Sequence, residues 1–138
     1  MHTLPLTSTV TINVVYISNM FRILISDNHP IFVDSLQIFI KSHYPEIFAA
    51  AAINKHEMLE KLSNEKWDLL LLDPGIFNSD AVKELGLITK SFYKIPIYVI
   101  GIFESGSYTD RLINAGAVDF IPKIRLPTEL PKVIDSLL

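Results

Sequence analysis

The sequence contains no cysteine, no run of basic residues and no long apolar segment. Without cysteine the chain cannot form disulfides, zinc–thiolate centres or a thiol nucleophile. The net charge is −3 and no basic tract is present, so nothing indicates a nucleic-acid-binding surface. The apolar runs are too short to span a bilayer, and residues 1–20 lack the features of a signal peptide. We therefore expect a soluble, cytoplasmic protein that does not enter a membrane.

The chain has 138 residues, of which 49% are apolar, and this is enough for one domain with a real core. Residues 21–138 have the regular pattern of that domain. Residues 1–20 do not match it and are expected to be an N-terminal extension. Within the extension, residues 9–17 are β-prone and are interpreted either as an extra edge strand or as a loose arm.

From residue 21 onward, short apolar runs alternate with segments of helical periodicity. Strands are predicted at 21–26, 47–53, 69–72, 97–102 and 118–121, and helices at 30–43, 56–63, 80–91, 108–115 and 128–138. The predicted helix-end residues are Ser79 as an N-cap, Ser107 with Asp110 as a capping box, Gly116 after a helix and Thr128 as an N-cap. The alternation predicts an α/β fold with a doubly wound, five-stranded parallel sheet in the flavodoxin-like order 2-1-3-4-5.

Four consecutive leucines, residues 69–72, are followed by Asp73. A short continuous apolar run is typical of a strand buried on both faces, as in a parallel sheet covered by helices. Asp73 then lies at the carboxyl end of the strand, the edge where ligands bind in open α/β sheets. The alternative is that Asp73 only caps the turn through Pro74 and Gly75, and this stretch alone favours capping.

Polar residues follow three of the predicted strands: Asp27 with Asn28, Asp73, and Lys123. Strands one and three are neighbours in the predicted order, so their carboxylates would form an oxygen-rich pocket suited to Mg²⁺. A lysine opposite them would pair with a bound oxyanion. Taken separately, each residue has another explanation, because Asp27 and Asn28 could shape the loop before Pro30 and Lys123 could be a solvated surface lysine. Their joint placement favours a site.

Three motifs resemble the receiver domain of two-component response regulators, and the resemblance covers residues 21–138. Asp27-Asn28-His29-Pro30 resembles the Asp-Asp-His-Pro form found in LuxR-type transcription regulators. Residues 68–73 resemble the strand that presents the phospho-accepting aspartate. Residues 115–123 resemble the Ala-Gly-Ala segment that leads to the family's lysine.

The resemblance implies that Asp73 accepts a phosphoryl group from a histidine kinase or another phosphodonor, with self-phosphorylation as the only activity. It implies Mg²⁺ bound by Asp27, Asn28, Asp73 and the backbone carbonyl of Gly75, and Lys123 paired with the phosphoryl oxygens. A homodimer is kept open as a further partner. DNA would be bound only through an output domain that is absent from this chain.

The sequence departs from the family pattern at three places, and one of them is the loop at residues 73–78, which replaces a usual loop containing Met-Pro-Gly. Asn28 stands where a second acid is usual, so Mg²⁺ binding is expected to be weak or absent. Gly101 stands where a switch threonine or serine is usual, and glycine has no hydroxyl to contact a phosphoryl group. Phe120 occupies the aromatic switch position, and a partly buried strand aromatic without a switching role is an equal explanation for it.

Three functions remain open on these grounds. The first is a phosphorylatable but atypical receiver, favoured by Asp73 and Lys123. The second is a phosphorylation-independent pseudo-receiver that acts as an interaction or dimerisation module, favoured by Asn28 and Gly101. The third, a flavin or nucleotide binder of the same fold, is disfavoured because the loop at 27–30 has no glycine to cradle a phosphate.

Overall fold

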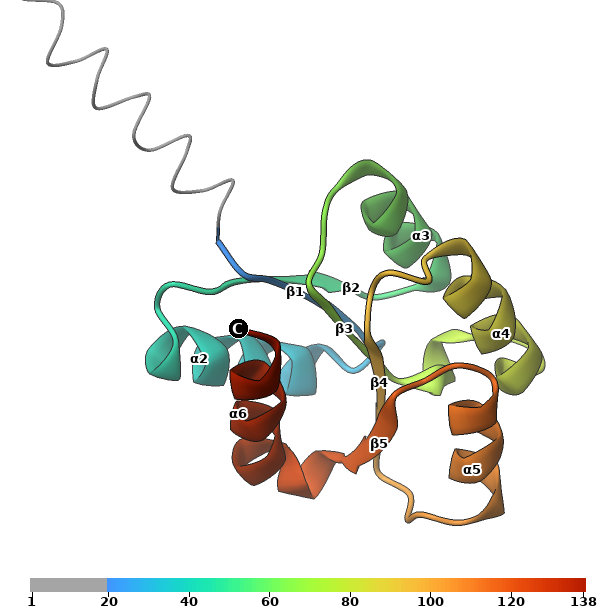
Figure 1. Ribbon diagram of the computed structural model, residues 1–138. Coiled ribbons are helices and arrows are strands. Elements are labelled where there is room, and N and C mark those ends of the chain that lie inside the picture. Colours follow the sequence, from blue (N-terminus) through green and yellow to red (C-terminus); the bar gives the residue numbers. More distant parts are fainter. Residues whose placement is uncertain (1–19) are drawn as a thin grey trace, which may run out of the picture.

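The computed structural model describes residues 20–138 and contains a five-stranded parallel sheet between two layers of helices (Figure 1). The strands are β1 (Arg22–Ser26), β2 (Phe48–Ala52), β3 (Leu69–Leu72), β4 (Ile97–Gly101) and β5 (Asp119–Pro122). Their order is β2-β1-β3-β4-β5, which confirms the predicted topology. The predicted β-prone segment at 9–17 lies outside the described residues. No helix within residues 20–138 is long and apolar enough to cross a membrane.

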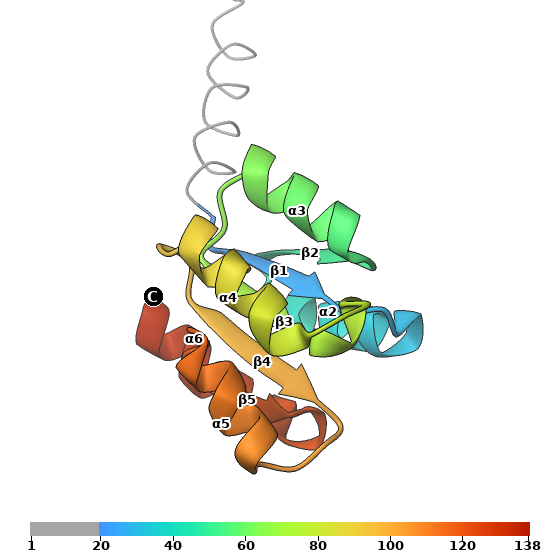
Figure 2. The same cartoon turned by 90° about the vertical axis from the view of Figure 1, so that its right-hand side faces the viewer.

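Five helices and two short 3-10 turns lie between the strands or after the last strand within the described residues. They are α2 (Pro30–His43), α3 (Lys55–Asn64), η1 (Pro74–Ile76), α4 (Ala81–Ser91), α5 (Ser107–Asn114), η2 (Lys123–Arg125) and α6 (Leu126–Leu137). Helices α2 and α6 cover one face of the sheet, and α3, α4 and α5 cover the other (Figures 1 and 2). This double layer requires strands that are apolar on both faces.

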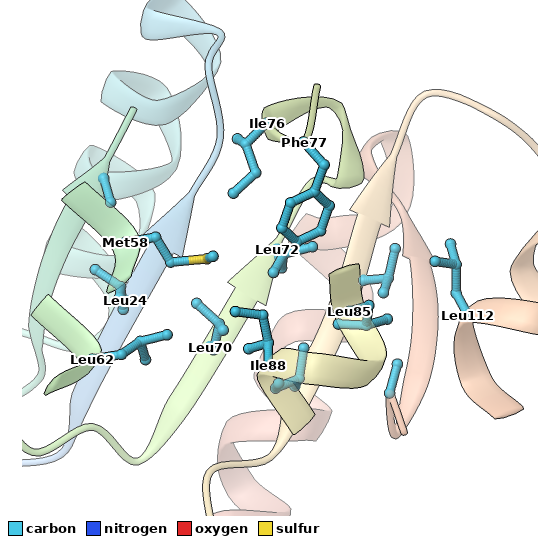
Figure 3. Close-up of a cluster of buried hydrophobic side chains, with 14 of the residues drawn as sticks. Leu24, Met58, Leu62, Leu70, Leu72, Ile76, Phe77, Leu85, Ile88 and Leu112 are labelled. Atoms are coloured by element: carbon cyan, nitrogen blue, oxygen red, sulfur yellow. The ribbon is translucent and has the colours of Figure 1, made fainter. Parts of the chain in front are cut away.

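The four leucines of β3 are all fully buried, as the apolar run predicts. Side chains alternate along a strand, so Leu70 and Leu72 pack toward α3, α4 and α5, whereas Leu69 and Leu71 pack toward α2 and α6. Figure 3 shows Leu70 and Leu72 at the centre of the apolar cluster between the sheet and helices α3, α4 and α5. Full burial of a leucine side chain contributes about 1.5–3 kcal/mol. The middle strand therefore anchors both layers.

The predicted N-cap of α4 at Ser79 is wrong by one residue. Asp80 is the cap, and its Oδ1 accepts hydrogen bonds from the backbone N–H groups of Val82 and Lys83. A carboxylate in this position accepts two of the unpaired N–H groups and also faces the positive end of the helix dipole. The neighbouring aspartate therefore takes the role assigned to the serine.

The predicted caps of α5 and α6 also need correction. For α5 the cap is Gly106 rather than Ser107, and the hydroxyl of Thr109 bonds with the backbone N–H and carbonyl of Gly106 at 2.9 Å. Thr128 lies inside α6, because the turn η2 leads directly into the helix at Leu126. A proline in the first turn of α6 costs no hydrogen bond there.

The prediction that Gly116 follows the end of α5 is confirmed. Its φ is +126°, in the region that favours glycine, and a Cβ atom there would lie 2.6 Å from the side chain of Thr89. The chain can turn into β5 only because this side chain is missing.

Candidate functional site

Two of the predicted site residues follow neighbouring strands at the same level of the sheet. Ser26 of β1 pairs in register with Leu72 of β3, so the next residues, Asp27 and Asp73, lie side by side at the carboxyl edge. Asp27 is fully buried and Asp73 nearly so. Two buried carboxylates in one place need a compensating positive charge.

Lys123 supplies that charge from the end of β5. Its Nζ lies 2.7 Å from Asp27 Oδ2 and 2.8 Å from Asp73 Oδ2, and its side chain is only 9% exposed. The ammonium group also lies 4.1 Å from the centre of the Phe32 ring, a favourable cation–π distance. Lys123 is therefore not a solvated surface lysine, which excludes the alternative left open by the sequence.

Each aspartate divides its two oxygens between its own loop and the site. Asp27 Oδ1 accepts a hydrogen bond from the His29 N–H at 2.9 Å, and Asp73 Oδ1 accepts one from the Gly75 N–H at 2.8 Å. The loop-shaping role that we considered as an alternative therefore coexists with the contacts to Lys123. Asp27 Oδ2 is buried and forms its ion pair with the Lys123 ammonium group at 2.7 Å. Both oxygens of this carboxylate therefore have a polar neighbour.

His29 is part of this site, although its place in the first motif predicted no role for it. Its Nδ1 lies 2.6 Å from Asp27 Oδ1, 3.3 Å from Lys123 Nζ and 3.9 Å from Asp73 Oδ2. Its side chain is 56% exposed. One donor atom each from Asp27, His29 and Asp73 lies within 4.8 Å of the others, a spacing that suits a metal ion. The signal that was missed is a histidine in the same short loop as a strand-end aspartate.

Asn28 and Gly75 lie together at the exposed rim of the site. The Asn28 Nδ2 donates to the Gly75 carbonyl at 3.4 Å, and a cleft of about 550 Å³ opens beside both residues. Carboxylate, amide and backbone carbonyl oxygens are ligands that a hard dication prefers, so this donor set fits Mg²⁺ in kind. Two carboxylates and one ammonium group leave a formal charge of only −1, since Asn28 is neutral. The ligand types therefore suit Mg²⁺, but the small negative charge of the site attracts the ion only weakly.

Phe103, which no sequence motif singled out, lies between the two predicted switch positions, Gly101 and Phe120. A Cβ atom on Gly101 would lie 2.4 Å from the ring of Phe103. That ring stacks on the ring of Phe120, with centroids 5.0 Å apart and planes 9° from parallel. Phe120 is only 7% exposed. Glycine at the end of a buried strand often marks such a close approach, and this was the available signal.

Tyr108 of α5 links this aromatic cluster to the acidic site. Its ring lies 5.4 Å from that of Phe103 in a tilted arrangement. Burial, and after it the negative charge of Asp73, raises the pKa of the Tyr108 hydroxyl. The negative charge of Asp73 therefore affects the pKa of a side chain at the start of α5.

The sequence profile of the response regulator receiver domain matches residues 23–135. A protein-glutamate methylesterase/protein-glutamine glutaminase of Clostridium acetobutylicum is 36% identical over 89 residues, which are 63% of this chain and 26% of the relative. A glycerol metabolism activator of Pseudomonas putida is 25% identical over 121 residues, which are 86% of this chain and 54% of the relative. The chain thus spans about a quarter and about half of the length of these two curated relatives.

Among solved structures, a response regulator receiver domain protein (CheY-like) from Methanospirillum hungatei JF-1 superposes with a TM-score of 0.74 at 24% identity. The match covers 86% of this chain and 93% of that chain. At this identity the likeness shows the fold. Together with the profile match over residues 23–135, it agrees with the sheet order described above. The chain belongs to the response regulator receiver domain family of two-component signalling.

Proposed function

We propose that this receiver domain accepts a phosphoryl group on Asp73 and does so with a weakened metal site. The observation that carries the proposal is the position of the Lys123 ammonium group, 2.7 and 2.8 Å from the buried carboxylates of Asp27 and Asp73. A buried cation between two acids stabilises the carboxylates until a phosphoryl group arrives. It then remains available to pair with the phosphoryl oxygens.

The transfer is nucleophilic catalysis by a carboxylate. A carboxylate oxygen of Asp73 attacks the phosphorus of a phosphohistidine or acyl phosphate donor and a new O–P bond forms. The bond between phosphorus and the leaving nitrogen or oxygen breaks, and the leaving group keeps its electron pair. The product is an aspartyl phosphate, whose oxygens take over the contact with Lys123.

Asp27, Asn28, Asp73 and the Gly75 carbonyl would hold Mg²⁺ in this proposal. When bound, the ion spreads the charge of the transferring group. We expect weak binding, because Asn28 contributes no charge and the adjacent ammonium group of Lys123 offsets one of the two carboxylates.

The partners follow from the family and from the first motif. A histidine kinase or a small phosphodonor would supply the phosphoryl group, and a homodimer remains a further candidate. The Asp27-Asn28-His29-Pro30 motif supports a parent regulator of LuxR type. Any DNA binding would then belong to an output domain outside this chain. Residues 1–20 would precede the receiver domain as an extension.

A second function is favoured by one specific observation. Phe103 fills the space in which a switch side chain at position 101 would lie, and it stacks on Phe120. A phosphoryl group at Asp73 then has no hydroxyl at position 101 to contact and no free space through which to move Phe120. The domain would in that case act as an interaction module whose surface does not depend on phosphorylation.

Intact mass after incubation with acetyl phosphate and Mg²⁺ separates the two functions. We expect the native protein and Asp110→Asn, which changes an exposed aspartate of α5, to gain one phosphoryl group. Asp73→Asn should gain none. If the native protein gains no mass at saturating Mg²⁺ and excess donor, the phosphorylation proposal is wrong and the interaction module remains.

A further inference from the structure

We propose that residues 9–17 add a strand to the open edge of the sheet, antiparallel to β2, with their apolar side chains in a groove against α2. These residues precede the described part of the chain, which begins at Met20. The groove lies at the amino end of β2, whereas Asp73 follows the carboxyl end of β3. The added strand is therefore independent of the proposed phosphorylation.

The outer edge of β2 carries backbone groups that can pair with another strand. Within the described residues β2 pairs with β1 alone and is an edge of the sheet. The Phe48 N–H donates to the Phe21 carbonyl at 2.9 Å, on the side of β1. Alternate residues face alternate sides of a strand, so the backbone groups of Ala49 and Ala51 face outward. The Gln37 side chain reaches the Ala49 carbonyl, but only at 3.4 Å.

An apolar groove of about 520 Å³ runs beside this edge, between β2 and α2. Ile38 of α2 and Phe48 of β2 line the groove and are 67% and 37% exposed. Met20, the first described residue, lines it as well. The chain that precedes the domain therefore begins at the groove, so residues 1–19 are in a position to cover it.

The segment has the composition of an edge strand. Residues 9–17 carry no charge and are rich in β-branched side chains. Apolar residues stand at alternate positions, which point to one face of a strand: Val10, Ile12, Val14 and Tyr16. Through residue 14 they alternate with Thr9, Thr11 and Asn13. With the apolar set directed toward α2, the strand covers Ile38 and leaves the polar set on the opposite face.

The short connection to β1 determines the direction of the strand. Only residues 18–20 separate the segment from Phe21, and the four Cα–Cα steps from residue 17 to residue 21 span at most about 14 Å. The distance from the outer side of β2 to β1 is two strand spacings, or about 10 Å, which this connection can cross. A strand parallel to β1 would need a crossover of roughly a dozen residues or more. The added strand therefore runs opposite to β1 and β2.

The added strand gives the edge of the sheet a partner within the same chain. β2 consists of Phe48 followed by four alanines and contains no charged residue. An uncharged open edge readily pairs with other chains, and native proteins usually cover such edges. Coverage by residues 9–17 prevents the domain from associating through β2.

Disulfide trapping tests this strand in the full chain, which has no cysteine of its own. Ala49→Cys is combined in turn with Ile12→Cys, Val14→Cys or Tyr16→Cys, and with Asn13→Cys as the matched control on the other face. Directly opposed residues of an antiparallel pair lie about 4.5–5.5 Å apart, within the range of a disulfide. We expect mild oxidation to remove the free thiols of one of the three pairs by closing a disulfide within the monomer. The control pair should keep its thiols.

Amide hydrogen exchange of the cysteine-free protein gives an independent readout. Only alternate N–H groups of the added strand face β2, so Ile12→Pro and Asn13→Pro are combined to remove one of the donors whatever the register. The Ala51 amide should exchange roughly tenfold faster in this double variant than in the native protein. Thr7→Pro with Ser8→Pro, which lies before the segment, is the control and should exchange at the native rate.

Three results would contradict the added strand. They are disulfides that form equally on both faces or on neither, disulfides that link two chains, and exchange at Ala51 that the prolines at 12 and 13 leave unchanged. Disulfides between two chains would assign the edge of β2 to a second copy of the protein. None of these results depends on Asp73, whose phosphorylation is measured separately by intact mass.

Discussion

The ring of Phe103 occupies the space that a side chain on Gly101 would fill. A Cβ atom on Gly101 would lie 2.4, 2.6 and 2.9 Å from three carbon atoms of that ring, and the ring itself stacks on Phe120. The space next to Gly101 is therefore filled by the ring of Phe103.

We predict that Gly101→Ala lowers the free energy of unfolding by about 1–3 kcal/mol, because the added methyl group displaces a packed ring. Phe103→Ala opens the space, so the double variant should lose less stability than the two single variants together. Urea unfolding of the four proteins measures the coupling between the residues. Additive losses would mean that the two side chains do not compete for the same space.

Gly86→Ala is the matched control for that substitution. Gly86 lies inside α4, and no described atom outside its own helical turn lies within 4 Å of a Cβ added there. Alanine should raise the free energy of unfolding by about 0.5–1 kcal/mol, because glycine in a helix interior is the less favourable residue. A stabilising effect at position 101 as well would contradict the packing explanation.

The same relationship, combined with the proposed phosphorylation of Asp73, predicts the response of the domain to a phosphoryl mimic. With beryllofluoride and saturating Mg²⁺, we expect amide signals of residues 102–107 and of Phe120 to shift little in the native protein. A ligand moves an equilibrium only by its different affinity for the two states. The double variant Gly101→Thr with Phe103→Ala supplies both the hydroxyl and the space, and its signals in this region should shift clearly. Equal responses in the two proteins would show that switching uses another route.

We predict that Asn28→Asp tightens Mg²⁺ binding by roughly tenfold, since a hard dication gains a charged oxygen ligand. Asn78→Asp is the control, because Asn78 lines the same cleft but lies outside the acidic group. Titration calorimetry compares the two variants with the native protein. If both variants tighten binding equally, the general charge of the cleft matters and Asn28 is not a ligand.

Lys123→Met should lower the free energy of unfolding by about 3–5 kcal/mol, because it leaves two buried carboxylates without their cation. Adding Asp27→Asn removes one of the two negative charges and should recover most of that loss. Lys132→Met breaks only an exposed pair with Glu129 and should cost less than about 1 kcal/mol. Urea unfolding near neutral pH checks all three. A small loss for Lys123→Met would mean that water replaces the ammonium group.

Alkaline pH offers a test of the packing of β4. Burial, and next the negative charge of Asp119, raises the pKa of Tyr98 above its ordinary value. A raised pKa in the folded state adds stability below the unfolded pKa of about 10, and that stability is lost as the pH rises through the folded value. Tyr98→Phe should therefore unfold with a weaker pH dependence above about pH 10 than the native protein. Tyr93→Phe, at an exposed tyrosine, should follow the native curve.

The meeting of Asp27, Asp73 and Lys123 could be predicted because the carboxyl ends of parallel strands share one edge of a sheet. The sequence pattern of apolar runs determines which residues stand at those ends. The burial of the leucines at 69–72 could also be predicted, since a short apolar run without polar interruption is typical of a strand buried on both faces.

His29 and Phe103 could not be placed by the same reasoning. Both lie in loops, where the direction of a side chain depends on contacts made by distant segments rather than on periodicity. The misplaced caps at Ser79 and Thr128 have a related cause. Neighbouring residues compete for a helix end with small energy differences, and a preceding 3-10 turn can begin a helix early.

The full burial of β3 has a consequence for amide hydrogen exchange in the sheet. This strand is hydrogen-bonded to β1 on one side and β4 on the other, whereas β2 and β5 form the edges. Amide protons at 69–72 should therefore exchange with solvent deuterium only through global opening, while those of the edge strands exchange through smaller local openings. Asp73 directly follows this central strand, so we expect its carboxylate to stay in position during local opening of the edge strands.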